Sequence, residues 1–177
     1  MIDIATAYNK YKFLGYEFLT WLWFSIENQP AVLTPPEHES LSVTIGNRIV
    51  LENSAIDRIE RITVKGDPAN YDTCMLSLQQ GAFISEIGLV LKTDLHEWEM
   101  TLKGESLSFT NYKTPPVAPV ESDESIETAV LEKAFLLEQG LRVIDHIFLA
   151  FIRQRISVSW QQGVAPAITT WIQAFQS

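Results

Sequence analysis

The segment from Phe13 to Asn28 carries so many large apolar side chains that no polar stripe is left along it. As a helix it would present leucine, phenylalanine or tryptophan on every side. A helix that is apolar around its whole circumference has to be covered on more than one side. The segment therefore predicts a central helix, with a sheet against one side and either C-terminal helices or a second subunit against another.

The aromatic residues of this helix are the candidates for partner binding. Trp21, Trp23 and Phe24 lie close together in the sequence. Aromatic side chains supply large buried areas in cores, and they also dominate binding hot spots. A sheet needs apolar cover, which favours a core role, while the all-round apolarity keeps a partner-binding role open for these three residues.

From Ser40 to Tyr112 the hydrophobic period changes to two, which is typical of half-buried antiparallel strands. Gly46-Asn47 predicts a tight hairpin turn near the start of this region. Short reversals between later runs favour an antiparallel sheet, because parallel strands need long crossovers. We expect five or six strands, with a short helix or turn between Ala69 and Gln80.

The rest of the chain predicts a linker followed by helices. Residues 113–125 are rich in proline and acidic residues, which is typical of a stiff, solvated linker. Residues 126–176 carry apolar side chains at spacings of three and four, as helices do. The 177 residues, 46% of them hydrophobic, suit one globular domain. We expect a single α+β domain over residues 1–177, with a helix at 13–28, an antiparallel sheet at 40–112, and helices at 126–176.

The charge balance opposes a simple nucleic-acid-binding protein. Thirteen Lys and Arg against 22 Asp and Glu give a formal net charge of −9, which disfavours binding to a phosphate backbone. A local basic strip is nevertheless present on the early strands, formed by Arg48, Arg58, Arg61 and Lys65. Acidic residues interspersed with it favour ordinary ion pairing. Direct DNA binding through this strip is the first alternative to a protein-binding role.

No residue pattern predicts catalysis, a cofactor or a metal site. On a strand, His96 would share a face with Trp98, while Glu97 and Glu99 would point the other way. Cys74 is the single cysteine and lacks a local partner, so we expect a small buried residue. The glycines form no phosphate-binding loop. A cryptic metal-dependent or cysteine hydrolase, built around His96 or Cys74, is a second alternative that requires distant residues to converge.

Neither apolar region of the chain predicts a membrane span. Residues 13–26 are shorter than the ~20 residues that cross a bilayer, and they include Glu17. Residues 141–156 are interrupted by charged side chains. The N-terminus also lacks the basic region of a secretory signal. We expect a cytoplasmic protein with no membrane partner.

The tryptophan-rich segment resembles a motif of the RdgC-like recombination-associated proteins of bacteria. The matching elements are Leu14-Gly15, Glu17-Phe18-Leu19 and Trp21-Leu22-Trp23, while Tyr16 stands where a basic residue is expected. The similarity extends through the strands after Ser40 and the helix from Ile126, so the chain resembles the C-terminal half of these longer proteins. The resemblance implies a non-enzymatic protein that acts near DNA recombination, with ring-shaped dimers that encircle duplex DNA in the better-known branch.

These observations lead to one main hypothesis. We expect a non-catalytic protein-interaction or assembly module, associated with DNA recombination or with bacterial defence against foreign nucleic acid. Its partner would be another protein chain, in a homo- or hetero-oligomer, and DNA would be contacted only indirectly or weakly. The docking surface would combine the helix that carries Trp21 with the C-terminal helices.

Overall fold

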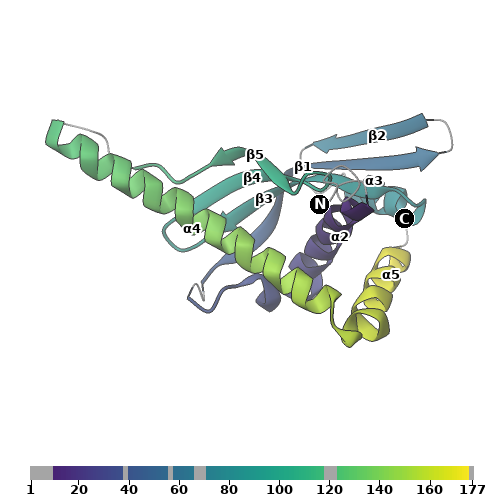
Figure 1. Cartoon of the computed structure of the whole chain (residues 1–177). Helices are drawn as coiled ribbons and strands as arrows, with labels where there is room; N and C mark the ends of the chain where they lie inside the picture. The colour runs from purple at the N-terminus through teal and green to yellow at the C-terminus, as the bar shows by residue number, and fades with distance from the viewer. Residues whose placement is uncertain (1–9, 38–39, 56–57, 66–70, 118–122, 176–177) are drawn as a thin grey trace, which may run out of the picture.

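The computed structural model of the chain describes residues 10–37, 40–55, 58–65, 71–117 and 123–175. Five antiparallel strands form one sheet in the order β2-β1-β3-β4-β5. Helices α2, α4 and α5 lie on one side of the sheet, which confirms the predicted α+β class (Figure 1). The strands are β1 (Ser42–Ala55), β2 (Arg58–Lys65), β3 (Phe83–Lys92), β4 (Glu97–Lys103) and β5 (Ser108–Lys113).

The helices follow the predicted order along the chain. The apolar N-terminal segment and the residues before Gln80 are both helical, as expected. The long C-terminal helix begins at Asp123, inside the predicted linker, where acidic residues suit the positive end of a helix. The elements are α2 (Phe13–Asn28), η1 (Pro30–Leu33), α3 (Tyr71–Gln79), α4 (Asp123–Arg155), η3 (Trp160–Val164) and α5 (Ala165–Ala174).

The predicted hairpin turn at Gly46-Asn47 is wrong. Strand β1 continues through both residues as far as Ala55, and only its register against β3 shifts between Ile45 and Ile49. A Cβ atom on Gly46 would lie 3.2 Å from the carbonyl carbon of Gly88, so the glycine allows a close approach between strands. A glycine in a strand pattern can mark such a bulge as well as a turn.

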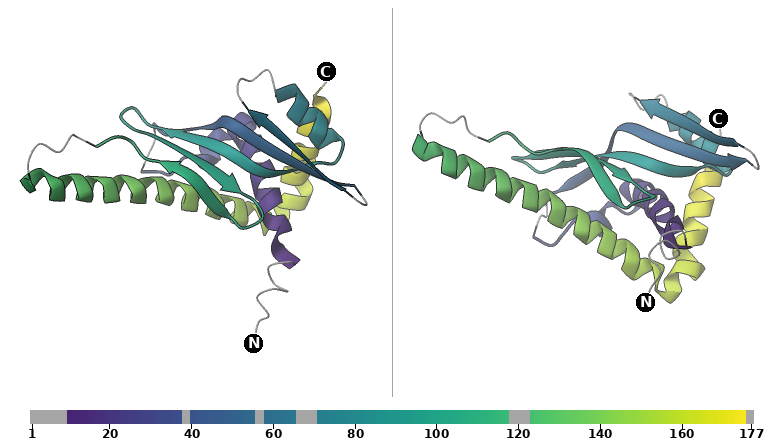
Figure 2. Two further views of the ribbon diagram at one scale, coloured as in Figure 1. Left: turned by 90° about the horizontal axis from the view of Figure 1, so that it is seen from above. Right: turned by 45° about the horizontal axis from the view of Figure 1, so that its top comes forward.

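Helix α2 lies between the sheet and the C-terminal helices, as the views from several directions show (Figure 2). Its side chains form one core cluster with β1, β3, β4, α3, α4 and α5. Phe18 contacts Phe148 and Phe151 of α4, with ring centroids 5.2 and 5.3 Å apart. Trp23 and Phe24 contact Trp171 of α5 at 5.7 and 5.8 Å. The chain itself therefore supplies the cover that an all-apolar helix needs.

Helix α4 is held against β4 and β5 at its middle. The indole nitrogen of Trp98 donates a hydrogen bond to the carbonyl oxygen of Leu136 at 2.8 Å. The hydroxyl of Tyr112 donates one to the carbonyl oxygen of Leu137 at 2.8 Å. Both aromatic side chains approach the helix beside Gly140, which is buried. The turns of α4 before this point extend beyond the sheet (Figures 1 and 2).

Within the described part of the chain, no helix has the length and apolar character needed to cross a membrane.

Candidate interaction surfaces

The structure places the three predicted partner-binding residues in the core. Trp21, Trp23 and Phe24 are buried, with 0%, 0% and 4% of their surfaces exposed. The indole nitrogen of Trp21 donates to Gln154 Oε1 of α4 at 2.8 Å. The partner-binding prediction for these side chains is therefore corrected to a core role, because α4 and α5 already occupy the space beside them.

Glu27 connects α2 with two of the elements that enclose it, α3 and α5. Its carboxylate accepts hydrogen bonds from Trp23 at 2.6 Å, from Tyr71 of α3 at 2.8 Å, and from Trp171 of α5 at 3.0 Å. Burial, together with the hydrogen bond to Glu27 and its negative charge, raises the pKa of the Tyr71 hydroxyl well above its ordinary value. This arrangement fixes α3 and α5 against the end of α2, which makes it a structural contact.

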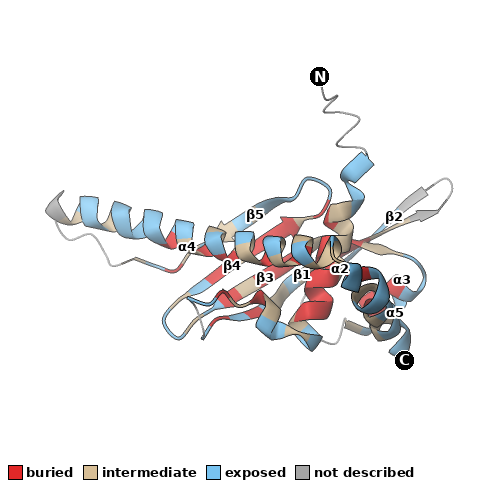
Figure 3. Cartoon of the chain, turned by 60° about the horizontal axis from the view of Figure 1, so that its bottom comes forward, coloured by how far each residue is buried: buried red, intermediate tan, exposed pale blue. Residues whose placement is uncertain are grey.

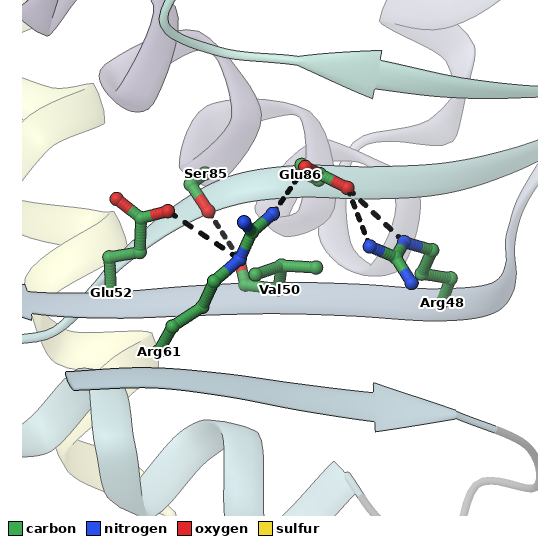
Figure 4. Close-up of polar contacts among 6 residues, drawn as sticks. All are labelled: Arg48, Val50, Glu52, Arg61, Ser85 and Glu86. Carbon is green, nitrogen blue, oxygen red and sulfur yellow. Dashed lines mark hydrogen bonds and ion pairs between the residues drawn. The ribbon is translucent and has the colours of Figure 1, made fainter. Parts of the chain in front are cut away.

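The predicted basic strip is largely paired with carboxylates. Arg48 donates to Glu86 Oε2 at 2.9 and 3.2 Å, and Arg61 donates to Glu86 Oε1 at 2.5 Å (Figure 4). Arg61 also lies 3.8 Å from Glu52 Oε1. Lys65 is exposed and stands opposite Arg48 in the register of β1 and β2. The backbone of Arg58 pairs with Ala55, and its side chain lies outside the described residues.

Glu86 is the shared partner in this arrangement. Burial raises the pKa of its carboxyl, but the hydrogen bond from Arg48 and the charges of Arg48, Arg61 and Lys103 outweigh burial and leave the pKa below its ordinary value. The carboxylate is therefore charged near neutral pH and offsets the two arginines. The structure brings Arg48, Arg61 and Lys65 to one face and at the same time neutralises much of their charge.

These residues belong to the face of the sheet that the helices leave open. Among the described residues of the five strands, the register places six Lys or Arg and four Glu on this face, an excess of two positive charges in a chain with net charge −9. A hollow of about 330 Å³ lies over Gly46 and Gly88, with Arg48 and Lys113 at its rim. The charged residues of the open face are Arg48, Arg61, Lys65, Lys92, Lys103, Lys113, Glu52, Glu86, Glu97 and Glu99.

The residues considered for a hydrolase do not converge. Cys74 is buried, and burial raises the pKa of its thiol to about 11, so the reactive thiolate is disfavoured. The His96 ring contacts Trp98, with centroids 5.7 Å apart, beside an open hollow of about 590 Å³. Among the described residues, no three His, Cys, Asp or Glu side chains are grouped to hold a metal ion.

Several exposed apolar residues lie close together on the N-terminal half of α4, which the burial view shows as largely exposed (Figure 3). Val130, Leu131 and Phe135 expose 61%, 63% and 56% of their surfaces. Contiguous exposed apolar side chains mark interaction sites more often than isolated ones do. We call Ile126, Val130, Leu131 and Phe135 the α4 apolar end.

Comparison with protein-family models, with curated proteins and with solved structures finds no match for this chain.

Sequence reasoning missed Glu86 as a functional candidate, and although it placed part of the docking surface on the C-terminal helices, it did not single out the α4 apolar end. Glu86 lies 38 residues from Arg48, and only the pairing of β1 with β3 brings them together. The apolar residues of α4 were visible as a pattern with spacings of three and four. That pattern fits a helix buried along its length equally well, so the signal did not separate core residues from exposed ones.

Proposed function

We propose that this chain is a non-catalytic protein-interaction module whose docking surface is the α4 apolar end. The observation that carries the proposal is the exposure of Val130, Leu131 and Phe135 on the N-terminal half of α4, the half whose first turns extend beyond the sheet (Figure 1). Leaving such side chains in water forgoes roughly 1.5–3 kcal/mol each relative to full burial. A protein partner that covers them gains this free energy.

The setting of this module is proposed from the sequence resemblance. The segment Phe13–Phe24 resembles the RdgC-like recombination-associated proteins, which supports a role beside DNA recombination or in bacterial defence against foreign nucleic acid. The acidic character of the chain supports a protein partner over a polyanion as the primary ligand. In this proposal, DNA is reached through the partner.

Site-specific photo-cross-linking in the producing cells tests the docking surface. A photoreactive phenylalanine analogue replaces Phe135 in one variant and Thr170, an exposed residue of α5, in a control variant. We expect protein adducts from position 135 and few from position 170. Equal yields from the two positions, or no adduct at position 135, would contradict the proposal.

A second candidate function is direct nucleic-acid binding through the open face of the sheet. The excess of positive charge on this face, against the net charge of the chain, supports it. Lys65 and Lys113 are exposed there. This function predicts that duplex DNA binds at low salt and that affinity falls steeply as salt rises.

Charge reversal at two positions separates this function from non-specific binding. The double variant Lys65→Glu, Lys113→Glu should lose DNA affinity, while Lys133→Glu on α4 serves as the control with an exposed lysine elsewhere. Fluorescence anisotropy with a labelled duplex measures both. Absence of binding at low salt, or an equal loss in the control, rules the candidate out.

A further inference from the structure

Helix α4 carries a second pattern, on the side that faces away from the sheet. Its buried side is formed by Leu136, Gly140, Val143 and Ile147. By helical periodicity, Leu131, Phe135, Glu138, Arg142 and Leu149 lie away from this buried side, and all five are exposed. We call them the α4 seam; Phe135, at its edge, also lines the hollow beside Trp98.

The spacing of the seam is that of a coiled coil. Its members, with Asp145, repeat at intervals of four and three residues from 131 to 149. This alternation keeps one line of side chains facing a partner helix. The ends of the line are apolar, since Leu131 and Leu149 expose 63% and 51% of their surfaces, while its middle is charged.

The charges of the seam specify how a partner helix would lie. Glu138 precedes Arg142, and the exposed acidic residue Glu127 stands at the other end of the helix from the exposed Arg153. In a parallel pair of identical helices, each of these groups would meet its own copy, and like charges would repel. In an antiparallel pair, acidic residues meet basic ones.

One antiparallel register pairs the apolar ends of the seam with each other and its opposite charges with each other. It sets Leu131 opposite the partner's Leu149, Glu138 opposite the partner's Arg142, and Glu127 opposite the partner's Arg153. Each contact occurs twice because the two-fold axis passes between the central charged pairs. The same register sets Phe135 opposite the partner's Asp145, so the seam is complementary to itself at its two leucines and at its ion pairs.

We propose that the α4 seam binds a second copy of this chain in an antiparallel, two-fold symmetric pair. This inference rests on the proposed protein-interaction function and names the partner. The sheets of the two copies lie on opposite sides of the paired helices, because each α4 packs on its own sheet through the side opposite the seam. The dimer therefore needs no rearrangement of the fold.

Charge-swap variants test the register. Glu138→Arg places two arginines at the centre of the seam, and Arg142→Glu places two glutamates there. We expect wild type to reach twice the 20.1 kDa mass of one chain at tens of micromolar, by sedimentation velocity. Each variant alone should dimerise at least about tenfold more weakly, since like charges would face each other. An equimolar mixture of the two should recover the dimer.

The mixture also controls for effects within one helix. Glu138 and Arg142 form an intrahelical ion pair at 2.7 Å, and both single variants lose it. Mixing cannot restore that pair, so recovery reports contacts between chains alone. Circular dichroism of each variant checks that α4 is still helical. A monomeric wild type, variants that dimerise as wild type does, or a mixture that stays monomeric would overturn the inference.

The cross-linking experiment separates this inference from the function on which it rests. Adducts from position 135 that contain two copies of this chain support both proposals. Adducts with a different protein only, together with a monomeric wild type, overturn the self-pairing and leave the interaction module in place. Absence of any protein adduct overturns both.

Discussion

The side chain of Trp98 on β4 donates a hydrogen bond to the backbone carbonyl of Leu136 on α4 at 2.8 Å. This contact fixes where the long helix leaves the body of the protein. It requires close approach, and a Cβ atom added to Gly140 would lie 2.9 Å from Trp98 Cδ1 and very near the Tyr112 hydroxyl. Gly140 therefore serves as the docking point of α4 on the sheet.

Replacing Gly140 by alanine should lower the free energy of unfolding by about 1–3 kcal/mol, because the added methyl group forces Trp98 and Tyr112 away from the helix. Gly163→Ala is the matched control, since a Cβ atom there would meet nothing within 4 Å. Urea unfolding followed by circular dichroism measures both. Equal effects of the two substitutions would contradict the role given to Gly140.

Trp21→Ala should destabilise the fold by about 3–5 kcal/mol, because a large, fully buried side chain leaves a cavity and Gln154 loses its hydrogen bond. Val158→Ala removes an apolar side chain that is 75% exposed and should change stability by less than about 0.5 kcal/mol. Chemical denaturation compares them. A stable Trp21→Ala protein with impaired partner binding would restore the interface role for this residue.

Glu86→Gln should reduce stability near neutral pH by about 1–2 kcal/mol, because both arginines lose a charge-assisted partner. The effect is no larger because Arg61 is half exposed and solvent screens its charge. The pKa of Glu86 is lowered in the folded state, so its contribution is complete above the ordinary pKa of 4.5 and disappears as pH falls through the folded-state pKa. Unfolding curves of both proteins between pH 3 and pH 7 check this. A difference that stays constant over this range would contradict the ion-pair explanation.

Tyr71→Phe should flatten the loss of stability at alkaline pH. The pKa of Tyr71 is raised above 10.0 in the folded state, so the hydroxyl contributes stability below pH 10.0 that is lost as pH rises further. One titrating group can lower the free energy of unfolding by at most about 1.4 kcal/mol per pH unit. We expect a smaller loss in wild type, because Tyr71 is only half-buried and solvent screens its interactions. Unfolding at pH 8 and pH 11 measures this loss of stability in wild type, Tyr71→Phe and Glu27→Gln. The loss in Glu27→Gln should lie between those of the other two proteins. Identical pH dependence in all three would show that Tyr71 is not coupled to Glu27.

The parts of the fold that the sequence predicted are those with strong local periodicity. Segment 13–28 is a helix because it is continuously apolar, and residues 83–103 form two strands because their side chains alternate. The turn predicted at Gly46-Asn47 was wrong because two-residue turns and bulges use the same residue types. The choice between them depends on Gly88, which lies more than 40 residues away in the sequence.

The candidate sites were less predictable than the fold. The residues of the basic strip lie on β1 and β2, but the register puts Arg58 out of phase with Arg61 and Lys65. The pairing of the strip with Glu86 also depends on strand register, which periodicity does not determine where a bulge intervenes. The burial of Trp21 depends on α4 and α5 packing over α2, and these contacts join residues more than 100 positions apart. Local patterns identify side chains that must be covered, but they do not identify what covers them.

The turns of α4 that extend beyond the sheet are held mainly by their own backbone hydrogen bonds. Helical segments of fewer than about 12–15 residues are only marginally stable in water without tertiary contacts. Amide hydrogens in residues 126–135 should therefore exchange with solvent much faster than those near Gly140, where α4 is docked. Slower exchange in this segment at higher protein concentration, or after a partner is added, would report occupancy of the surface directly, without any substitution in the chain.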